Sequence, residues 1–129
     1  MISGIGIDII EIERIKESYT KHGEKFLTRL FTPAEQAYFK TFNDPLPIIA
    51  GRWAAKEAIA KALGSGFGEK LYFTEIEIIN NKAGKPEVTL SPRCQAIFDD
   101  PSILLSISHC NSHATATALT QIKKIQTTC

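Results

Sequence analysis

The chain has 129 residues, of which 43% are hydrophobic, and its charges nearly cancel to a formal net charge of +1. This length suits a single domain over residues 1–129 that buries about two thirds of its unfolded surface without disulfides. The balanced charge argues against a nucleic-acid binder, and no apolar run is long enough for a membrane span. Three scattered cysteines and the lack of a secretory leader predict a cytoplasmic protein.

The expected elements of the N-terminal half follow from hydrophobic periodicity and turn signals. Residues 2–10 are predicted to form a buried strand, because isoleucine and glycine dominate them. Helical spacing then predicts four helices: one from about residue 10 to a break at His22-Gly23, and three over residues 24–30, 33–42 and 48–63. The third helix begins with a capping box, in which Thr32 is the cap and Glu35 closes the box.

The C-terminal half is predicted to contain strands and one short helix. Strand-like residues occupy 71–79, 87–90, 103–108 and 114–120, and a short helix covers 92–98. The first two strands flank a turn that contains Gly84, which indicates a hairpin. These elements predict an α+β fold with helices packed on an antiparallel sheet, followed by a frayed tail over residues 121–129.

The helix expected over residues 48–63 is apolar or small on nearly its whole circumference, which is typical of a buried helix. It nevertheless carries two charged pairs at the i,i+4 spacing. Glu57 and Lys61 have the favourable order of a surface ion pair. Arg52 and Lys56 have like charges, which repel unless an anion or an acid lies near them. Their basic stems either snorkel past aliphatic neighbours to solvent, or they bind a phosphate-rich ligand while Glu57 holds a cation.

Three further features have both a structural and a functional interpretation. Asp8 stands alone in an apolar run, so its carboxylate either caps the next helix together with Glu11 or is paired or bound to a metal. The glycine-rich loop over 64–68 is either a flexible turn or a phosphate contact. His109 ends an apolar strand and is either a hydrogen-bonded structural histidine or a side chain at the rim of a site.

Several motifs together resemble one protein family. They are Gly4-Ile-Gly-Ile-Asp8 with Glu11-Ile-Glu-Arg14, Phe31-Thr-Pro-Ala-Glu35, Arg52-Trp-Ala-Ala-Lys-Glu-Ala58 with Lys61-Ala-Leu-Gly64, Gly84-Lys-Pro86, and Ser106-Ile-Ser-His109. Their types and order resemble the holo-[acyl-carrier-protein] synthases, the small class of 4′-phosphopantetheinyl transferases, from about residue 2 to residue 119. One departure is Trp53, which stands where phenylalanine is usual.

The resemblance implies an enzyme that moves the phosphopantetheine arm of coenzyme A to a serine of apo acyl carrier protein, for fatty acid synthesis, and releases 3′,5′-ADP. It implies that Asp8, Glu57 and Lys61 are catalytic. Asp8 and Glu57 would bind Mg²⁺, and Lys61 would contact the pyrophosphate and assist departure of the nucleotide phosphate. The group that takes the serine proton stays open between Asp8, Glu57 and a metal-bound water, and Asp8 acting through such a water is favoured. The family also implies a homotrimer with active sites between protomers.

The same resemblance implies contacts to the nucleotide and to the carrier protein. Seven residues are expected to border coenzyme A: Arg52 and His109 at the 3′-phosphate, Lys61 at the pyrophosphate, Gly64 and Ser65 in the adjoining loop, and Gly84 and Pro86 by the adenine. Arg14 matches a family position that meets the acidic carrier, and Lys25 and Arg29 match by charge and approximate place. The alternative for these three is an ordinary solvated helix face.

A rival interpretation is a non-catalytic module that binds a nucleotide or a phosphorylated partner. It would use the basic side chains of Arg52, Lys56, Lys61 and His109. This interpretation gives the carboxylates of Asp8 and Glu57 no role.

Overall fold

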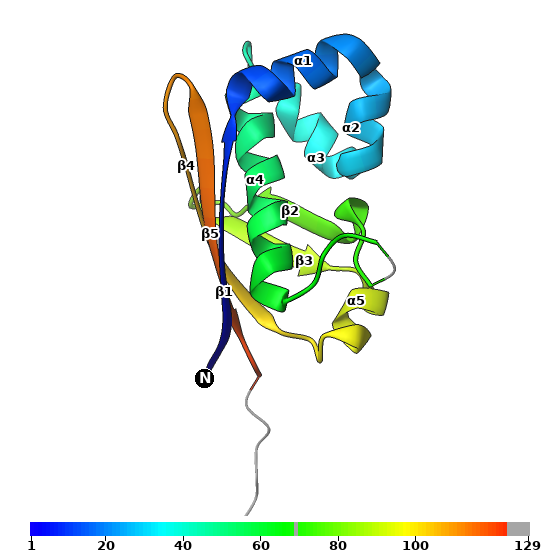
Figure 1. The fold of residues 1–129 in the computed structure, drawn as a ribbon, viewed down its shortest axis with the longest axis vertical. Coiled ribbons are helices and arrows are strands. Elements are labelled where there is room, and N and C mark those ends of the chain that lie inside the picture. The colour runs from blue at the N-terminus through cyan, green and yellow to red at the C-terminus, as the bar shows by residue number, and fades with distance from the viewer. Residues whose placement is uncertain (69, 124–129) are drawn as a thin grey trace, which may run out of the picture.

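The computed structural model describes residues 1–68 and 70–123, which form an α+β fold, as predicted. The elements are β1 (Ile2–Glu11), α1 (Ile12–His22), α2 (Glu24–Leu30), α3 (Pro33–Phe39), α4 (Leu46–Leu63), a short 3₁₀ turn η1 (Phe73–Glu75), β2 (Ile76–Asn80), β3 (Pro86–Leu90), α5 (Pro92–Ile97), β4 (Ser102–His109) and β5 (His113–Gln121). Figure 1 shows the long strands edge-on, with every labelled helix on one side of them.

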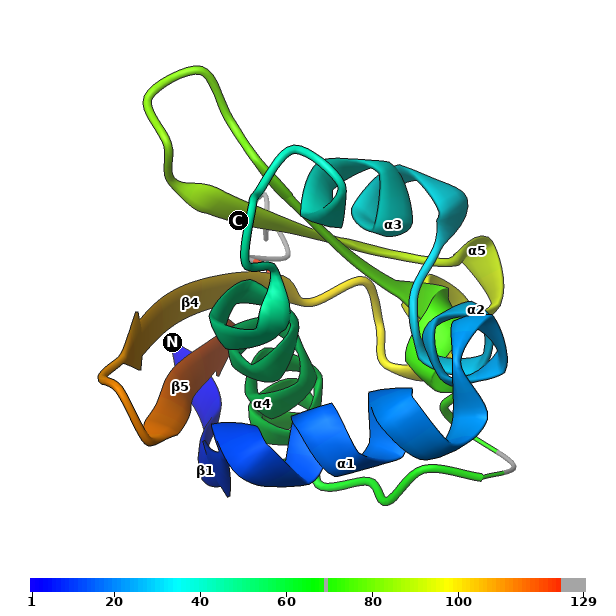
Figure 2. The same ribbon diagram turned by 90° about the horizontal axis from the view of Figure 1, so that it is seen from above.

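The strands form two antiparallel sheets, whereas one sheet was expected. β1, β5 and β4 make a three-stranded sheet in that order, and β2 pairs only with β3 in a hairpin. In Figure 2 the hairpin runs beside β4, the edge strand of the three-stranded sheet, and β3 contacts β4. The pattern of apolar residues in a strand indicates which face of the strand is buried, but it does not indicate which other strand pairs with it. The division into two sheets could therefore not be predicted from the sequence.

α4 packs on the inner face of the three-stranded sheet at very short range. A Cβ atom added at Gly4 would lie 1.9 Å from the carbonyl oxygen of Ala62, and one at Gly6 would lie 2.0 Å from that of Ala58. Only glycine therefore fits at these two positions of β1. The predicted burial of the central helix is confirmed, because Ala54, Ala58 and Ile59 are completely covered.

Several expected boundaries differ from those of the structure. Residues 71–75 are not part of a strand, since η1 precedes β2. α3 ends at Phe39 and only turns continue to Phe42, while α4 begins at Leu46. The capping box of α3 is confirmed: the Thr32 hydroxyl accepts from the Glu35 amide at 3.3 Å, and Glu35 Oε1 accepts from the Thr32 amide at 2.9 Å.

The expected tail over residues 121–129 lies mostly outside the described residues, which end at 123. Gln121 still pairs in β5, and Lys123 Nζ lies 2.8 Å from Asp100 Oδ2. Among the described residues, no helix has the length and hydropathy needed to cross a bilayer.

Candidate active site

The three predicted catalytic residues meet between β1 and α4. Asp8 lies on β1, and Glu57 and Lys61 lie one turn apart on α4; we call these three residues the carboxylate cluster. The close packing of α4 on the glycines of β1 brings the two elements near enough for these side chains to interact. The backbone of Asp8 is fixed as well, because its carbonyl oxygen accepts a hydrogen bond from Thr115 Oγ1 at 2.7 Å.

Asp8 is not a helix cap. It lies inside β1, and α1 begins only after Glu11, which makes no capping hydrogen bond through its side chain. Instead, Lys61 Nζ donates to Asp8 Oδ1 at 3.0 Å and to the carbonyl oxygen of Ile7 at 2.9 Å. The expected surface pair between Glu57 and Lys61 is therefore wrong, since Lys61 pairs with Asp8 across the two elements.

The carboxylate cluster has the charge and the unpaired oxygen atom that a bound cation would need. Asp8 Oδ2 is buried and has no hydrogen-bond partner among the described residues. Burial raises the pKa of Glu57, the charge of Asp8 raises it further, and Lys61 opposes both effects. Two interacting carboxylates thus share one lysine, with one oxygen left unsatisfied. The described residues hold no group of three or more His, Cys, Asp or Glu for a metal, but two carboxylates completed by waters are a common Mg²⁺ arrangement. The residues present fit that ion.

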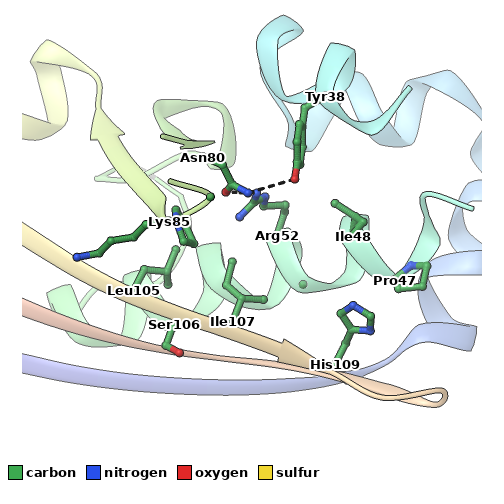
Figure 3. Close-up of a pocket in the computed structure, with 13 residues that line it drawn as sticks. Tyr38, Pro47, Ile48, Arg52, Asn80, Lys85, Leu105, Ser106, Ile107 and His109 are labelled. Atoms are coloured by element: carbon green, nitrogen blue, oxygen red, sulfur yellow. Dashed lines mark hydrogen bonds between the residues drawn. The ribbon is translucent and has the colours of Figure 1, made fainter. Parts of the chain in front are cut away.

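Most of the predicted nucleotide-binding residues line a second site, a pocket of about 420 Å³ that we call the Arg52 pocket. It lies between α4, α3, the β2–β3 hairpin and β4 (Figure 3). Of the predicted residues, it contains Arg52, Gly84, Pro86 and His109. Sequence reasoning missed two polar residues of the same lining, Tyr38 and Asn80, and it named Lys85 and Ser106 only as members of family motifs.

Arg52 and Lys56 do not share a ligand. The ammonium of Lys56 is completely buried and donates to Glu35 Oε1 at 2.7 Å and to the carbonyl oxygens of Leu30 and Phe73 at 2.8 and 2.9 Å. All three N–H donors of the lysine are therefore used. Arg52 is 4% exposed, so neither side chain snorkels to solvent. The hypothesis of one anion between the two basic residues is wrong for Lys56, because an internal acid neutralises it.

That acid, Glu35, was assigned only to the capping box. Its side chain is 1% exposed, and its Oε2 also accepts from the Ile78 amide at 3.0 Å. One carboxylate thus ties α3, α4 and β2 together. The signal in the sequence is the i,i+4 spacing of the like charges Arg52 and Lys56, which predicts a nearby acid or anion. It does not indicate which residue of the chain supplies the acid.

The remaining predicted residues lie elsewhere on the molecule. Gly64 ends α4 in a left-handed conformation with φ of 72°, and Ser65 Oγ donates to the carbonyl oxygen of Gly66 at 2.9 Å. Both lie next to the Lys61 end of α4 and outside the Arg52 pocket. Lys25 and Arg29 flank a hollow of about 600 Å³ that includes Phe26, Tyr72 and Phe73. Arg14 is exposed on α1 and does not line it.

The carboxylate cluster and the Arg52 pocket lie on different sides of α4. Arg52 and Glu57 are five positions apart, which separates their directions by about 140° around the helix. The residues that line the Arg52 pocket include none of the carboxylate cluster. Within the described part of the chain, the expected catalytic and nucleotide-binding residues therefore form two separate groups.

Comparison with known proteins identifies the family. The family model of the 4′-phosphopantetheinyl transferase superfamily matches residues 4–125. The chain is 49% identical over 119 residues to a holo-[acyl-carrier-protein] synthase of Protochlamydia amoebophila, covering 92% of this chain and 98% of that relative. The crystal structure of the holo-[acyl-carrier-protein] synthase from Neisseria meningitidis matches with a TM-score of 0.88 and 34% identity, over 94% of this chain and 99% of that one.

A second solved structure contains a ligand. The Helicobacter pylori holo-[acyl-carrier-protein] synthase in complex with coenzyme A matches with a TM-score of 0.84 and 37% identity, over 91% of this chain and 99% of that one. Sequence and fold thus agree along nearly the whole length of the chain. The chain belongs to the holo-[acyl-carrier-protein] synthases of the 4′-phosphopantetheinyl transferase superfamily.

Proposed function

We propose that this enzyme transfers the 4′-phosphopantetheine arm of coenzyme A to a serine of apo acyl carrier protein and releases 3′,5′-ADP. The observation that carries the proposal is that Asp8 Oδ2 is buried without a hydrogen-bond partner among the described residues and that Asp8 interacts with Glu57. In a member of this transferase family, such a pair of carboxylates suits phosphoryl transfer. The product would be holo carrier protein for fatty acid synthesis in the cytoplasm. A purely binding module is disfavoured, because it leaves the two interacting carboxylates without a role.

Asp8 and Glu57 would hold Mg²⁺. A cation there would satisfy Asp8 Oδ2 and would lower the pKa of Glu57, which burial raises most and the charge of Asp8 raises further. When bound, Mg²⁺ supplies charge neutralisation and polarisation of the pyrophosphate. Lys61 already pairs with the other carboxylate oxygen, Asp8 Oδ1, at 3.0 Å.

The transfer itself is a displacement at phosphorus. The serine oxygen of the carrier forms a bond to the phosphorus that bears the pantetheine arm, and the bond from that phosphorus to the bridging oxygen breaks. The hydroxyl proton goes to a base of the carboxylate cluster, and the electron pair of the broken bond stays on 3′,5′-ADP. Lys61 uses two of its three N–H donors on Asp8 and Ile7 and is 54% exposed at its side chain, so its third donor can contact the leaving phosphate.

The Arg52 pocket would hold the nucleotide end of coenzyme A. Arg52 and His109 would bind the 3′-phosphate, and the turn of Gly84 and Pro86 would lie by the adenine. Gly64 and Ser65 would border the pyrophosphate, because they adjoin the Lys61 end of α4. The guanidinium of Arg52 supports this role, since its Nε is buried and has no partner among the described residues.

We further propose a homotrimer with active sites between protomers. The outer face of the three-stranded sheet exposes Ile5, Ile7 and Ile9 at 68, 63 and 65%, and no described element covers it. Large apolar patches of this kind usually mark an interface. A site shared between protomers would also explain why the carboxylate cluster and the Arg52 pocket lie apart in one protomer.

Acyl carrier proteins are acidic, so the carrier would dock on the basic surface of α1 and α2. Lys25 and Arg29 border a hollow with aromatic walls, which suits a partner helix that presents an apolar residue among acidic ones. Arg14 would extend this basic surface along α1. The exposed Glu13 and Glu17 on the same helix weaken its positive potential.

One assay tests the proposal directly. The full chain is incubated with coenzyme A, Mg²⁺ and apo acyl carrier protein, and the carrier is weighed by mass spectrometry. We expect the carrier to gain the mass of one phosphopantetheine group with the wild type. Asp8→Ala and Glu57→Ala should abolish the gain while the proteins stay folded. If coenzyme A stabilises the protein thermally without Mg²⁺ and no carrier protein gains mass, the protein is a binding module and the proposed transferase activity is wrong.

A further inference from the structure

Three side chains from three elements form a hydrogen-bonded chain on the inner wall of the Arg52 pocket. Asn80, the last residue of β2, donates through Nδ2 to the hydroxyl of Tyr38 on α3 at 3.2 Å. Its Oδ1 accepts from Arg52 Nη2 on α4 at 2.7 Å. The dashed lines in Figure 3 mark these hydrogen bonds among Arg52, Asn80 and Tyr38.

The partners of Asn80 fix the orientation of its amide. Arg52 offers only donors, so the oxygen of the amide must face it and the nitrogen must face Tyr38. Tyr38 also contacts Arg52 directly, because the guanidinium carbon lies 5.3 Å from the centre of the tyrosine ring, a cation–π arrangement. The guanidinium is thus held on two sides, by an amide oxygen and by an aromatic ring.

Both of these partners are electrically neutral, which distinguishes Arg52 from its neighbour on the helix. Lys56 is paired with the carboxylate of Glu35 at 2.7 Å. None of the ion pairs found among the described residues includes Arg52. Arg52 is nevertheless 96% covered, and its Nε lacks a partner among these residues. Its positive charge is fixed in position and remains available to an anion.

We propose that Tyr38 and Asn80 are positioning residues that hold Arg52 for a nucleotide phosphate without neutralising its charge. This inference rests on the proposed function, in which Arg52 binds the 3′-phosphate of coenzyme A. A carboxylate in the place of Asn80 would hold the guanidinium equally well, but it would compete with the phosphate for it. The neutral amide is therefore what makes the pocket selective for a ligand with the additional phosphate.

The test uses Asn80→Asp, which keeps the size and the hydrogen bond to Arg52 and adds one negative charge. Affinities for adenosine 3′,5′-bisphosphate and for adenosine 5′-monophosphate are measured by calorimetry on the full chain, without Mg²⁺. We expect the bisphosphate affinity to fall at least about tenfold, since a charge-assisted contact is lost. The monophosphate affinity should change less than about twofold. The unfolding temperature should stay the same or rise, because a new ion pair forms with Arg52.

Two further variants complete the test. Tyr38→Phe retains the ring and removes the hydroxyl that orients Asn80, so it should lower the bisphosphate affinity several-fold and selectively. The matched control is Asn81→Asp, which adds the same charge one residue away, where the side chain accepts from the amides of Ala83 and Lys85 in the hairpin turn. It should retain the selectivity of the wild type.

The outcomes separate the two proposals. If the wild type prefers the bisphosphate and Asn80→Asp retains that preference, the positioning inference is wrong and the proposed function stands. If Asn80→Asp and Asn81→Asp lose the same selectivity, a general charge effect replaces the inference. If the wild type shows no preference for the bisphosphate, the assignment of Arg52 to the 3′-phosphate is wrong, and the inference fails with it.

Discussion

The buried lysine of α4 gives a prediction whose magnitude follows from its surroundings. Lys56→Met keeps an unbranched apolar side chain and removes the ammonium. The change takes a donor from Glu35 and from the carbonyl oxygens of Leu30 and Phe73. Glu35 keeps its hydrogen bonds from the backbone amides, but its carboxylate, which is 1% exposed, then lacks an opposite charge.

Removing one partner of a buried ion pair costs about 3–5 kcal/mol, because the other charge remains uncompensated. For a chain of this length, we expect the unfolding temperature to fall by roughly 12–20 °C, at about 4 °C per kcal/mol. Such a loss is a large part of the stability of a typical domain. The double variant Lys56→Met/Glu35→Gln should recover about 1–3 kcal/mol relative to the sum of the single variants, since it leaves no buried charge.

Urea unfolding followed by the fluorescence of Trp53, the single tryptophan, measures these differences. Lys40→Met is the matched control, because Lys40 is exposed and should change the stability by less than about 0.5 kcal/mol. Folded Lys56→Met should keep the KM for coenzyme A, since Lys56 does not line the Arg52 pocket. A loss of stability no larger than that of the control would refute the buried-pair argument. A selective rise in the KM for coenzyme A would instead support the hypothesis that Arg52 and Lys56 bind one anion together.

Four further predictions test the sites and the fold. Arg52→Ala should raise the KM for coenzyme A about tenfold or more relative to dephospho-coenzyme A; equal effects on both substrates would contradict the phosphate contact. The double reversal Arg14→Glu/Arg29→Glu should raise the KM for the carrier, leave that for coenzyme A nearly unchanged and flatten the salt dependence of kcat/KM; an unchanged carrier KM and salt slope would move the docking surface elsewhere. Gly6→Ala should destabilise the fold by about 1–3 kcal/mol and weaken Mg²⁺ binding in calorimetry, because the new methyl group pushes β1 away from α4. The control is Gly66→Ala, whose added methyl group meets no atom within 4 Å. Equal stabilities of the two variants would contradict the packing argument. Hydrogen bonds from Arg93 lower the pKa of Glu75 from 4.5 to about 2. The stability that Glu75 contributes is therefore present above pH 4.5 and is lost as the pH falls towards 2. Glu75→Gln should reduce the change of the unfolding free energy between pH 4.5 and pH 2, and an unchanged pH dependence would refute this assignment.

The sequence by itself determined the features that depend on near neighbours in the chain. The helical spacing of α1 and the burial of the alanine-rich α4 are local patterns that fix which side of an element faces the interior. The predicted burial of β1 is wrong for one face of the strand, because Ile5, Ile7 and Ile9 are 68, 63 and 65% exposed and the glycines of the strand face α4 instead. The capping box of Thr32 and Glu35 is local too, because its two residues are three positions apart. The order of the family motifs also indicated Asp8, Glu57 and Arg52 before any contact was known.

Only the tertiary structure decided which groups face one another across long stretches of chain. Lys61 pairs with Asp8, 53 residues away, and Lys56 pairs with Glu35, 21 residues away. In both cases the local rule for charges at i,i+4 gave the wrong partner or none. For Lys56 the reason is burial, because an i,i+4 spacing contributes only about 0.2–0.5 kcal/mol in solvent, whereas a buried ammonium without an acid costs several kcal/mol. For Lys61, which is 54% exposed, the reason is proximity, because the packing of α4 on β1 places Asp8 Oδ1 at 3.0 Å. The fold therefore selects one partner by burial and the other by distance in space, and neither quantity is contained in the spacing of residues along the chain.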